Sequence, residues 1–170
     1  MTTGATQPAF QPPAPINWAE LIAVGRGTLI PQPPAAQPTT GAIRRAISTA
    51  YYAAFHALAA SNADALIGPA HDQLTAEAWF RIYRGLDHNH AKSQLQQNRA
   101  YLPADAQVFA DLFRDLQNER HNADYNPRAS PTARTAATWL NKAEAAIVDF
   151  LQVSRSERAA IAILTLTRTR

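Results

Sequence analysis

The feature that most restricts the fold of this 170-residue chain is its alanine-rich middle, which also contains many Leu, Gln, Arg and Glu residues. These residues lose little side-chain freedom in a helix and favour helices over strands. Val and Ile are scattered, and no alternating run of apolar and polar residues indicates a strand. Because 46% of the residues are hydrophobic, the chain has enough material for a core. We therefore expect an all-α protein, a bundle of about five helices.

Proline, capping and turn signals set the expected boundaries. Residues 1–15 are rich in proline and predict a flexible N-terminal tail, and the proline-rich run 31–38 predicts a stiff extended connector. The bundle is expected over 16–153, and 154–170 as a C-terminal helix or a fraying tail. The expected helices cover 18–29, 41–60, 72–99 with a break near 85–87, 104–125 and 130–153.

Composition excludes several classes of chemistry. The chain has no Cys, which excludes disulfides, thiolate metal sites and Cys nucleophiles. With 6 Gly there is little material for a phosphate-cradling loop, and no dinucleotide fingerprint is present, so no cofactor is expected. The net charge of +3 is compatible with a nucleic-acid partner without indicating one. No apolar run approaches the ~20 residues of a membrane span, and no secretory signal is visible, so a cytoplasmic location is expected by default.

The expected helix 104–125 carries two different faces. Its apolar residues follow the i, i+3, i+4, i+7 spacing of one buried stripe. Arg120 falls on the same side as that stripe, and a guanidinium near the core needs a counter-charge. Asp124 lies one turn later and is its natural partner, which predicts a structural ion pair. The stripe consists of Phe109, Leu112, Phe113 and Leu116.

Arg114, Asn118 and His121 fall on the opposite face, with Tyr125 one turn beyond. An exposed Arg and His seven residues apart most often belong to an ordinary solvated surface. Imidazole, however, transfers protons near neutral pH, and a guanidinium can grip a phosphate and stabilise charge in the transition state. Together they suffice for metal-free RNA cleavage by attack of the 2′-OH on the adjacent phosphate.

Two stretches resemble the motifs of HEPN domains. The run 44–56, RRAISTAYYAAFH, is similar to the family's RRAxSxAYYAxFH helix. The run 114–125, RDLQNERHNADY, resembles the later signature in two ways. Arg114 and the polar Asp115 precede His121 with six intervening residues, and Arg120, Asp124 and Tyr125 match an RxxADY-like ending. The resemblance spans about 18–150.

The resemblance implies a helical fold and one of two functions. Catalytic HEPN proteins are typically dimers whose Arg/His motifs meet to form one composite ribonuclease site, and this implies Arg114 and His121 as catalytic residues. Other members are inactive partners of small nucleotidyltransferases. In some toxin pairs a Tyr two residues after the His is modified; here that position is Ala123, and the nearest Tyr is Tyr125.

The helix 41–60 offers second-helix contributors to such a site. Arg45, Tyr52 and His56 lie roughly opposite its expected core stripe, although packing or a structural hydrogen bond is the more ordinary role of Tyr52 and His56. The stripe consists of Ile43, Ile47, Ala50, Ala54 and Leu58.

The cluster Asp87-His88-Asn89-His90 invites a metal hypothesis. On a helix, His88 and His90 would point about 200° apart and could not share an ion, so we interpret the cluster as a polar break and expect no metal. Arg81, Arg84 and Lys92 form either a basic flank for a phosphate backbone or a solvated face. The aromatic side chains of 79–83 are expected in the core.

The leading hypothesis is a metal-independent endoribonuclease (a hydrolase) of the toxin or defence type, acting on RNA as a homodimer. Arg114 and His121 would be catalytic, and Asn118, Arg120, Asp124, Tyr125 and Asp115 would support them. The alternative is a non-catalytic HEPN module that binds RNA or a nucleotidyltransferase. The expected partners are RNA, a second copy of the chain, and an antitoxin or a nucleotidyltransferase. A plain helical scaffold is the third reading.

Overall fold

The computed structural model describes residues 12, 14–31 and 36–168, and in this part of the chain every regular element is helical. The expectation of an all-α bundle is confirmed, but the count of about five helices is wrong. The region 72–99 forms two separate helices, and 154–167 contributes a further one. The α-helices are α1 (Trp18–Thr28), α2 (Thr40–Leu66), α3 (Gln73–Arg84), α4 (His88–Gln97), α5 (Ala104–Tyr125), α6 (Ala133–Gln152) and α7 (Arg155–Leu166), with a 3₁₀ turn, η1, at Arg99–Tyr101.

The predicted tail and the proline connector fall largely outside the described residues, which omit 1–11, 13 and 32–35. Side-chain caps explain where several helices begin. Asp72 and Thr75 form a reciprocal capping box before α3, and Ser154 and Glu157 form one before α7. None of the helices in the described ranges combines the length and apolarity needed to cross a bilayer.

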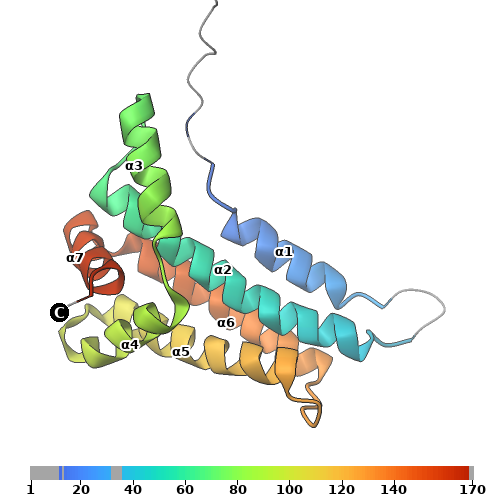
Figure 1. Ribbon diagram of the computed structural model, residues 1–170. Coiled ribbons are helices and arrows are strands. Elements are labelled where there is room, and N and C mark those ends of the chain that lie inside the picture. Colours follow the sequence, from blue (N-terminus) through green and yellow to red (C-terminus); the bar gives the residue numbers. More distant parts are fainter. Residues whose placement is uncertain (1–11, 13, 32–35, 169–170) are drawn as a thin grey trace, which may run out of the picture.

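Helix α2 is the central element of the bundle. It packs against α1, α3, α5, α6 and α7, and Figure 1 shows it running between α1 and α5. Alanines on several sides of the helix are fully buried, because a small side chain lets a neighbouring backbone approach closely. Consequently α2 has no wide polar face, contrary to the expected opposition of core and polar sides. The buried alanines include Ala46, Ala50 and Ala54 on one side and Ala59 and Ala63 on the other.

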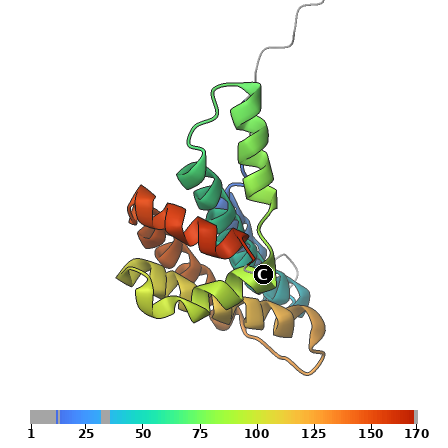
Figure 2. The ribbon, with the colours of Figure 1, turned by 60° about the vertical axis from the view of Figure 1, so that its left-hand side comes forward.

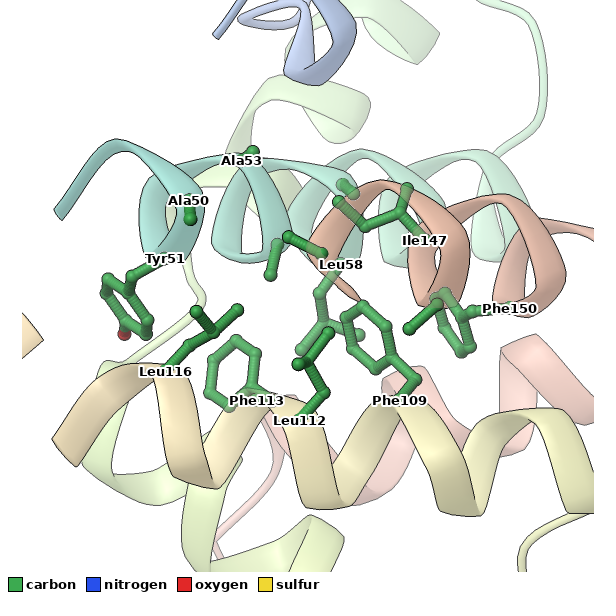
Figure 3. Packing of buried hydrophobic residues seen from close by; sticks show 14 of the residues in the cluster. Ala50, Tyr51, Ala53, Leu58, Phe109, Leu112, Phe113, Leu116, Ile147 and Phe150 are labelled. Atoms are coloured by element: carbon green, nitrogen blue, oxygen red, sulfur yellow. The ribbon is translucent and has the colours of Figure 1, made fainter. Parts of the chain in front are cut away.

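The core lies where α2, α5 and α6 meet (Figure 3). The rings of Phe109 and Phe150 stack with centroids 4.3 Å apart, and both side chains are fully buried. Burying each such side chain contributes about 1.5–3 kcal/mol. The stripe predicted on α5 is confirmed, since Phe109, Leu112, Phe113 and Leu116 are all buried.

The C-terminal helix α7 is docked on the end of α2. The expected end of this helix at residue 60 is wrong, because α2 continues to Leu66 through Asn62. The Asn62 side chain is fully buried, and its Nδ2 donates to Oγ1 of Thr165 over 3.0 Å. Arg155 Nε donates to the carbonyl oxygen of Ala65 over 3.1 Å. These bonds extend α2 beyond the predicted end and fix α7 to it.

Helix α3 stands away from the other helices in two views (Figures 1 and 2). The indole Nε1 of Trp79 donates to Asp64 Oδ1 over 2.8 Å and pins α3 to α2. Trp79 is buried, as expected, whereas Phe80 is 44% exposed, so its assignment to the core was wrong. The break predicted at 85–87 is confirmed and separates α3 from α4.

Candidate functional site

A polar hollow of about 330 Å³ lies between α4 and α5. We call it the α4–α5 hollow. Two of its side chains are fixed cations, two are imidazoles, and none is a carboxylate, so its lining suits an anion. Of the predicted site residues, the structure brings Asn118, Arg120 and His121 together here. The complete lining is His88, Asn89, Lys92, Gln117, Asn118, Arg120 and His121.

His121 is exposed to solvent on α5. Its ring centroid lies 5.1 Å from that of Tyr125, the last residue of the helix. Within the described residues the imidazole has no hydrogen-bond partner and no ion-pair partner. It is therefore free to exchange a proton with a ligand in the α4–α5 hollow.

Arg120 lies beside His121 and is held at one end. Its Nε donates to Asp124 Oδ2 over 3.2 Å, and its side chain is 21% exposed. The guanidinium carbon lies 5.3 Å from the ring centre of Tyr51 and 5.1 Å from that of Tyr52, an arrangement that fixes a cation against aromatic faces. The two Nη atoms make no hydrogen bond in the described part of the chain, and this leaves them available to phosphate oxygens.

The predicted pair of Arg120 and Asp124 has a third member. The hydroxyl of Ser48, a buried residue of α2, donates a short hydrogen bond to Asp124 Oδ1. Asp124 therefore fixes the end of α5 to α2 as well as the position of Arg120.

Arg114 does not line the α4–α5 hollow. Its Nε donates to Asp115 over 2.8 Å, and its Nη1 lies 3.0 Å from Gln96 Oε1 and 3.4 Å from Asp111 Oδ1. The hydrogen bond to Asp115 is the main cause that raises the pKa of Arg114. Asp115 is thus the main counter-charge of this guanidinium, and Asp111, which Arg99 holds at 2.7 Å, is shared with it. Within one chain, the structure places His121 with Arg120 rather than with Arg114.

His88, Asn89 and Gln117 line the α4–α5 hollow but were not predicted as site residues, and His88 was interpreted as part of a polar break. His88 Nδ1 shares a short hydrogen bond with the hydroxyl of Tyr51, and its ring stacks on Phe55 with centroids 4.0 Å apart. Burial, and then the charge of Arg120, lower the pKa of His88. The sequence signal was Asp87, which caps α4 and places His88 in its first turn. The contact with α5 is tertiary and leaves no local signal.

The α2 candidates lie behind the hollow or away from it. His56 Nδ1 bonds the hydroxyl of Tyr83 over 2.8 Å, and burial, followed by the charge of His88, lowers the pKa of His56. Tyr52 packs on Arg120 and stacks on His56. Arg45 is exposed and does not line the hollow.

The two histidines of α4 have separate partners, since His90 Nε2 lies 2.8 Å from the carbonyl oxygen of Thr167. No group of three or more His, Asp or Glu side chains gathers to hold a metal ion among the residues that the structure describes.

The fold and the hollow define a class: a helical bundle that presents imidazole and cationic side chains in one anion-compatible depression. No family model, curated protein or solved structure matches this chain.

Proposed function

We propose that this protein is a HEPN-type, metal-independent endoribonuclease whose site is the α4–α5 hollow. The observation that carries the proposal is the exposure of His121 in the same hollow as Arg120 and Lys92, with no carboxylate in the lining. An RNA backbone is an anion, and its cleavage through a cyclic phosphate needs proton transfer and charge stabilisation but no metal.

In this proposal His121 transfers the proton, and Arg120 holds the scissile phosphate through its free Nη atoms. Lys92 adds a second positive charge on the facing helix. Arg114, the arginine expected from the Arg-x6-His spacing, is the rival clamp. Its bonds to Asp111 and Asp115 of its own helix occupy the guanidinium, and its bond to Gln96 of α4 favours a supporting role in positioning α4 against α5.

A homodimer is part of the proposal, because catalytic HEPN proteins build their site from two subunits. Tyr125, next to His121, is 65% exposed and would lie near such a contact. Light scattering on the purified chain measures this directly: a mass of two chains supports the composite site, and a monomer that cleaves RNA restricts the site to one chain.

The test is cleavage of a mixed RNA pool in the presence of EDTA. We expect cleavage by the wild type and a loss of about 100-fold or more in His121→Ala and Arg120→Ala, with unchanged circular dichroism. Arg114→Ala should lose less than Arg120→Ala. His71→Ala, an exposed histidine outside the hollow, is the matched control and should keep the wild-type rate. Undiminished cleavage by His121→Ala would defeat the proposal.

The second candidate function is a non-catalytic module that binds RNA or a nucleotidyltransferase. It is favoured by the ion pairs of Arg114 with Asp111 and Asp115, because they leave the motif arginine less available to bind a phosphate. For this function we expect the wild type to bind RNA without cleaving it, and Lys92→Ala to bind RNA more weakly.

A further inference from the structure

The α4–α5 hollow is lined by a second imidazole, which comes from the other helix. His88 comes from the first turn of α4 and His121 from the last turns of α5, and both line the same depression. Side chains from two helices that face one space can act on two sides of a bound group. The expected Arg/His motif supplies only one of them.

The ring of His88 is held more firmly than that of His121. Tyr51, which is fully buried, bonds Nδ1, and Phe55 stacks on the ring face. Nε2 is consequently the one ring nitrogen without a partner within the described residues. A ring fixed at one nitrogen, with the other free, is the arrangement that orients a general base.

The surroundings favour the neutral form of this ring. Burial and Arg120 of α5 lower the pKa of His88, and Asp87 at the start of α4 acts in the opposite direction. Lys92, one turn along α4, and His121 on α5 are the other titratable groups of the hollow. From α2, Tyr51 presents a hydroxyl whose pKa burial raises, so it stays protonated, and His56 is close enough for its pKa to be lowered by His88.

We propose that His88 is a second catalytic residue, the general base that pairs with His121 as general acid. This inference rests on the ribonuclease function proposed above. It requires the tautomer with hydrogen on Nδ1, donated to the Tyr51 oxygen, so that Nε2 keeps its lone pair.

The step balances as follows. The 2′-oxygen forms a bond to phosphorus while its proton passes to His88 Nε2. The bond between phosphorus and the 5′-oxygen breaks, and that oxygen takes a proton from the imidazolium of His121. The products are a 2′,3′-cyclic phosphate and a 5′-hydroxyl end. His88 is then cationic and His121 neutral, and exchange of protons with water restores both.

The test compares His88→Asn with the wild type. Asn keeps an amide N–H that can donate to the Tyr51 oxygen as Nδ1 does, so the bundle is preserved, but it has no basic nitrogen. We expect kcat to fall about 100-fold or more, within the range of a lost general base. The acidic limb of the pH profile of kcat/KM should disappear. The Kd for a non-cleavable 2′-deoxy oligonucleotide should stay within about threefold, and free imidazole should partly restore cleavage by His88→Ala.

Tyr51→Phe is the matched control for positioning. It removes only the hydroxyl that orients His88, so we expect a smaller loss of kcat with the acidic limb retained.

Three results overturn the inference in distinguishable ways. If His88→Asn keeps the wild-type kcat while His121→Ala is inactive, the role of His88 is disproved and the proposed ribonuclease function stands. A loss confined to Kd, with kcat and the pH profile intact, makes His88 a binding residue and defeats its role as a base. Absence of cleavage by the wild type removes both proposals.

Discussion

The Arg44 guanidinium donates a hydrogen bond from Nη1 to the carbonyl oxygen of Ala123 over 2.6 Å. The same side chain also reaches the carbonyl oxygens of Asn126 and Ala129, just beyond the end of α5. The last carbonyls of a helix lack backbone partners, and a positive charge there is favourable. Arg44 therefore holds the end of α5, with His121 two residues before Ala123, against the start of α2.

Arg44→Ala is expected to lower the free energy of unfolding by about 1–3 kcal/mol, because charged hydrogen bonds to part-buried carbonyls are lost. Urea denaturation followed by circular dichroism measures the change. Arg45→Ala, at the exposed neighbouring position, should change stability by less than about 0.5 kcal/mol. Equal losses in the two variants would contradict the assigned role.

Asp124→Asn is expected to lower the free energy of unfolding by about 1–3 kcal/mol. The change weakens the bonds to Ser48 and Arg120, two side chains that are buried or largely so. The matched control is Glu77→Gln, which removes another i, i+4 ion pair, that of Glu77 with Arg81. The side chain of Glu77 is 52% exposed and that of Arg81 is 78% exposed. An exposed pair of this kind contributes below about 0.5 kcal/mol, so chemical denaturation should separate the variants.

Phe109→Ala is expected to cost about 3–5 kcal/mol, since it removes a fully buried ring stacked on Phe150 and leaves a cavity. Val108→Ala, one position earlier but 57% exposed, should leave the urea midpoint almost unchanged. A small effect at Phe109 would show that the α5–α6 contact is not central to the core.

Stability should fall as the pH drops from about 7 to 5, before the carboxylates titrate. His56 and His88 both have a folded-state pKa below the unfolded value, so the unfolded chain binds more protons in this window. Their stabilising contribution is complete above the unfolded pKa and is lost as the pH falls through the folded pKa. Urea midpoints at pH 7.5, 6.5 and 5.5 measure this decline.

Replacing both His56 and His88 by Gln in one variant should flatten the dependence of stability on pH in that interval. His71→Gln, at an exposed position, should retain the wild-type slope. An unaltered slope in the double variant would assign the decline to other groups.

The fold was most predictable where local signals coincide. For α5, Pro103, the apolar stripe and Asn126-Pro127 all indicate the same segment, and the observed bounds Ala104–Tyr125 agree with it. For α2, Asn62 carries a local loop signal. Its hydrogen bond to Thr165, more than 100 residues later, overrides that signal and continues the helix.

The candidate site was predictable only along one helix. A helical wheel places Arg114 and His121 on one side of α5, but it contains no information about Gln96 of α4, which binds Arg114. The wheel also turned Arg120 toward the core, and the structure shows why this was half correct: its guanidinium rests on Tyr51 and Tyr52 at the edge of the core. The place of His88 in the hollow could not be predicted from the sequence, because its neighbours in space come from other helices.

Helix α4 leans on the C-terminal helix as well as on α5. It has only ten residues, with Ala91 and Leu95 as its buried ones, and His90 ties it to the carbonyl oxygen of Thr167 just after α7. Helix α7, which the sequence predicted as either a helix or a fraying tail, thus supports α4. It contributes no side chain to the α4–α5 hollow, but it packs against α4 and adds Ile161 to the core, so a chain shortened at residue 153 is expected to lose the support of one wall of the hollow as well as part of its core.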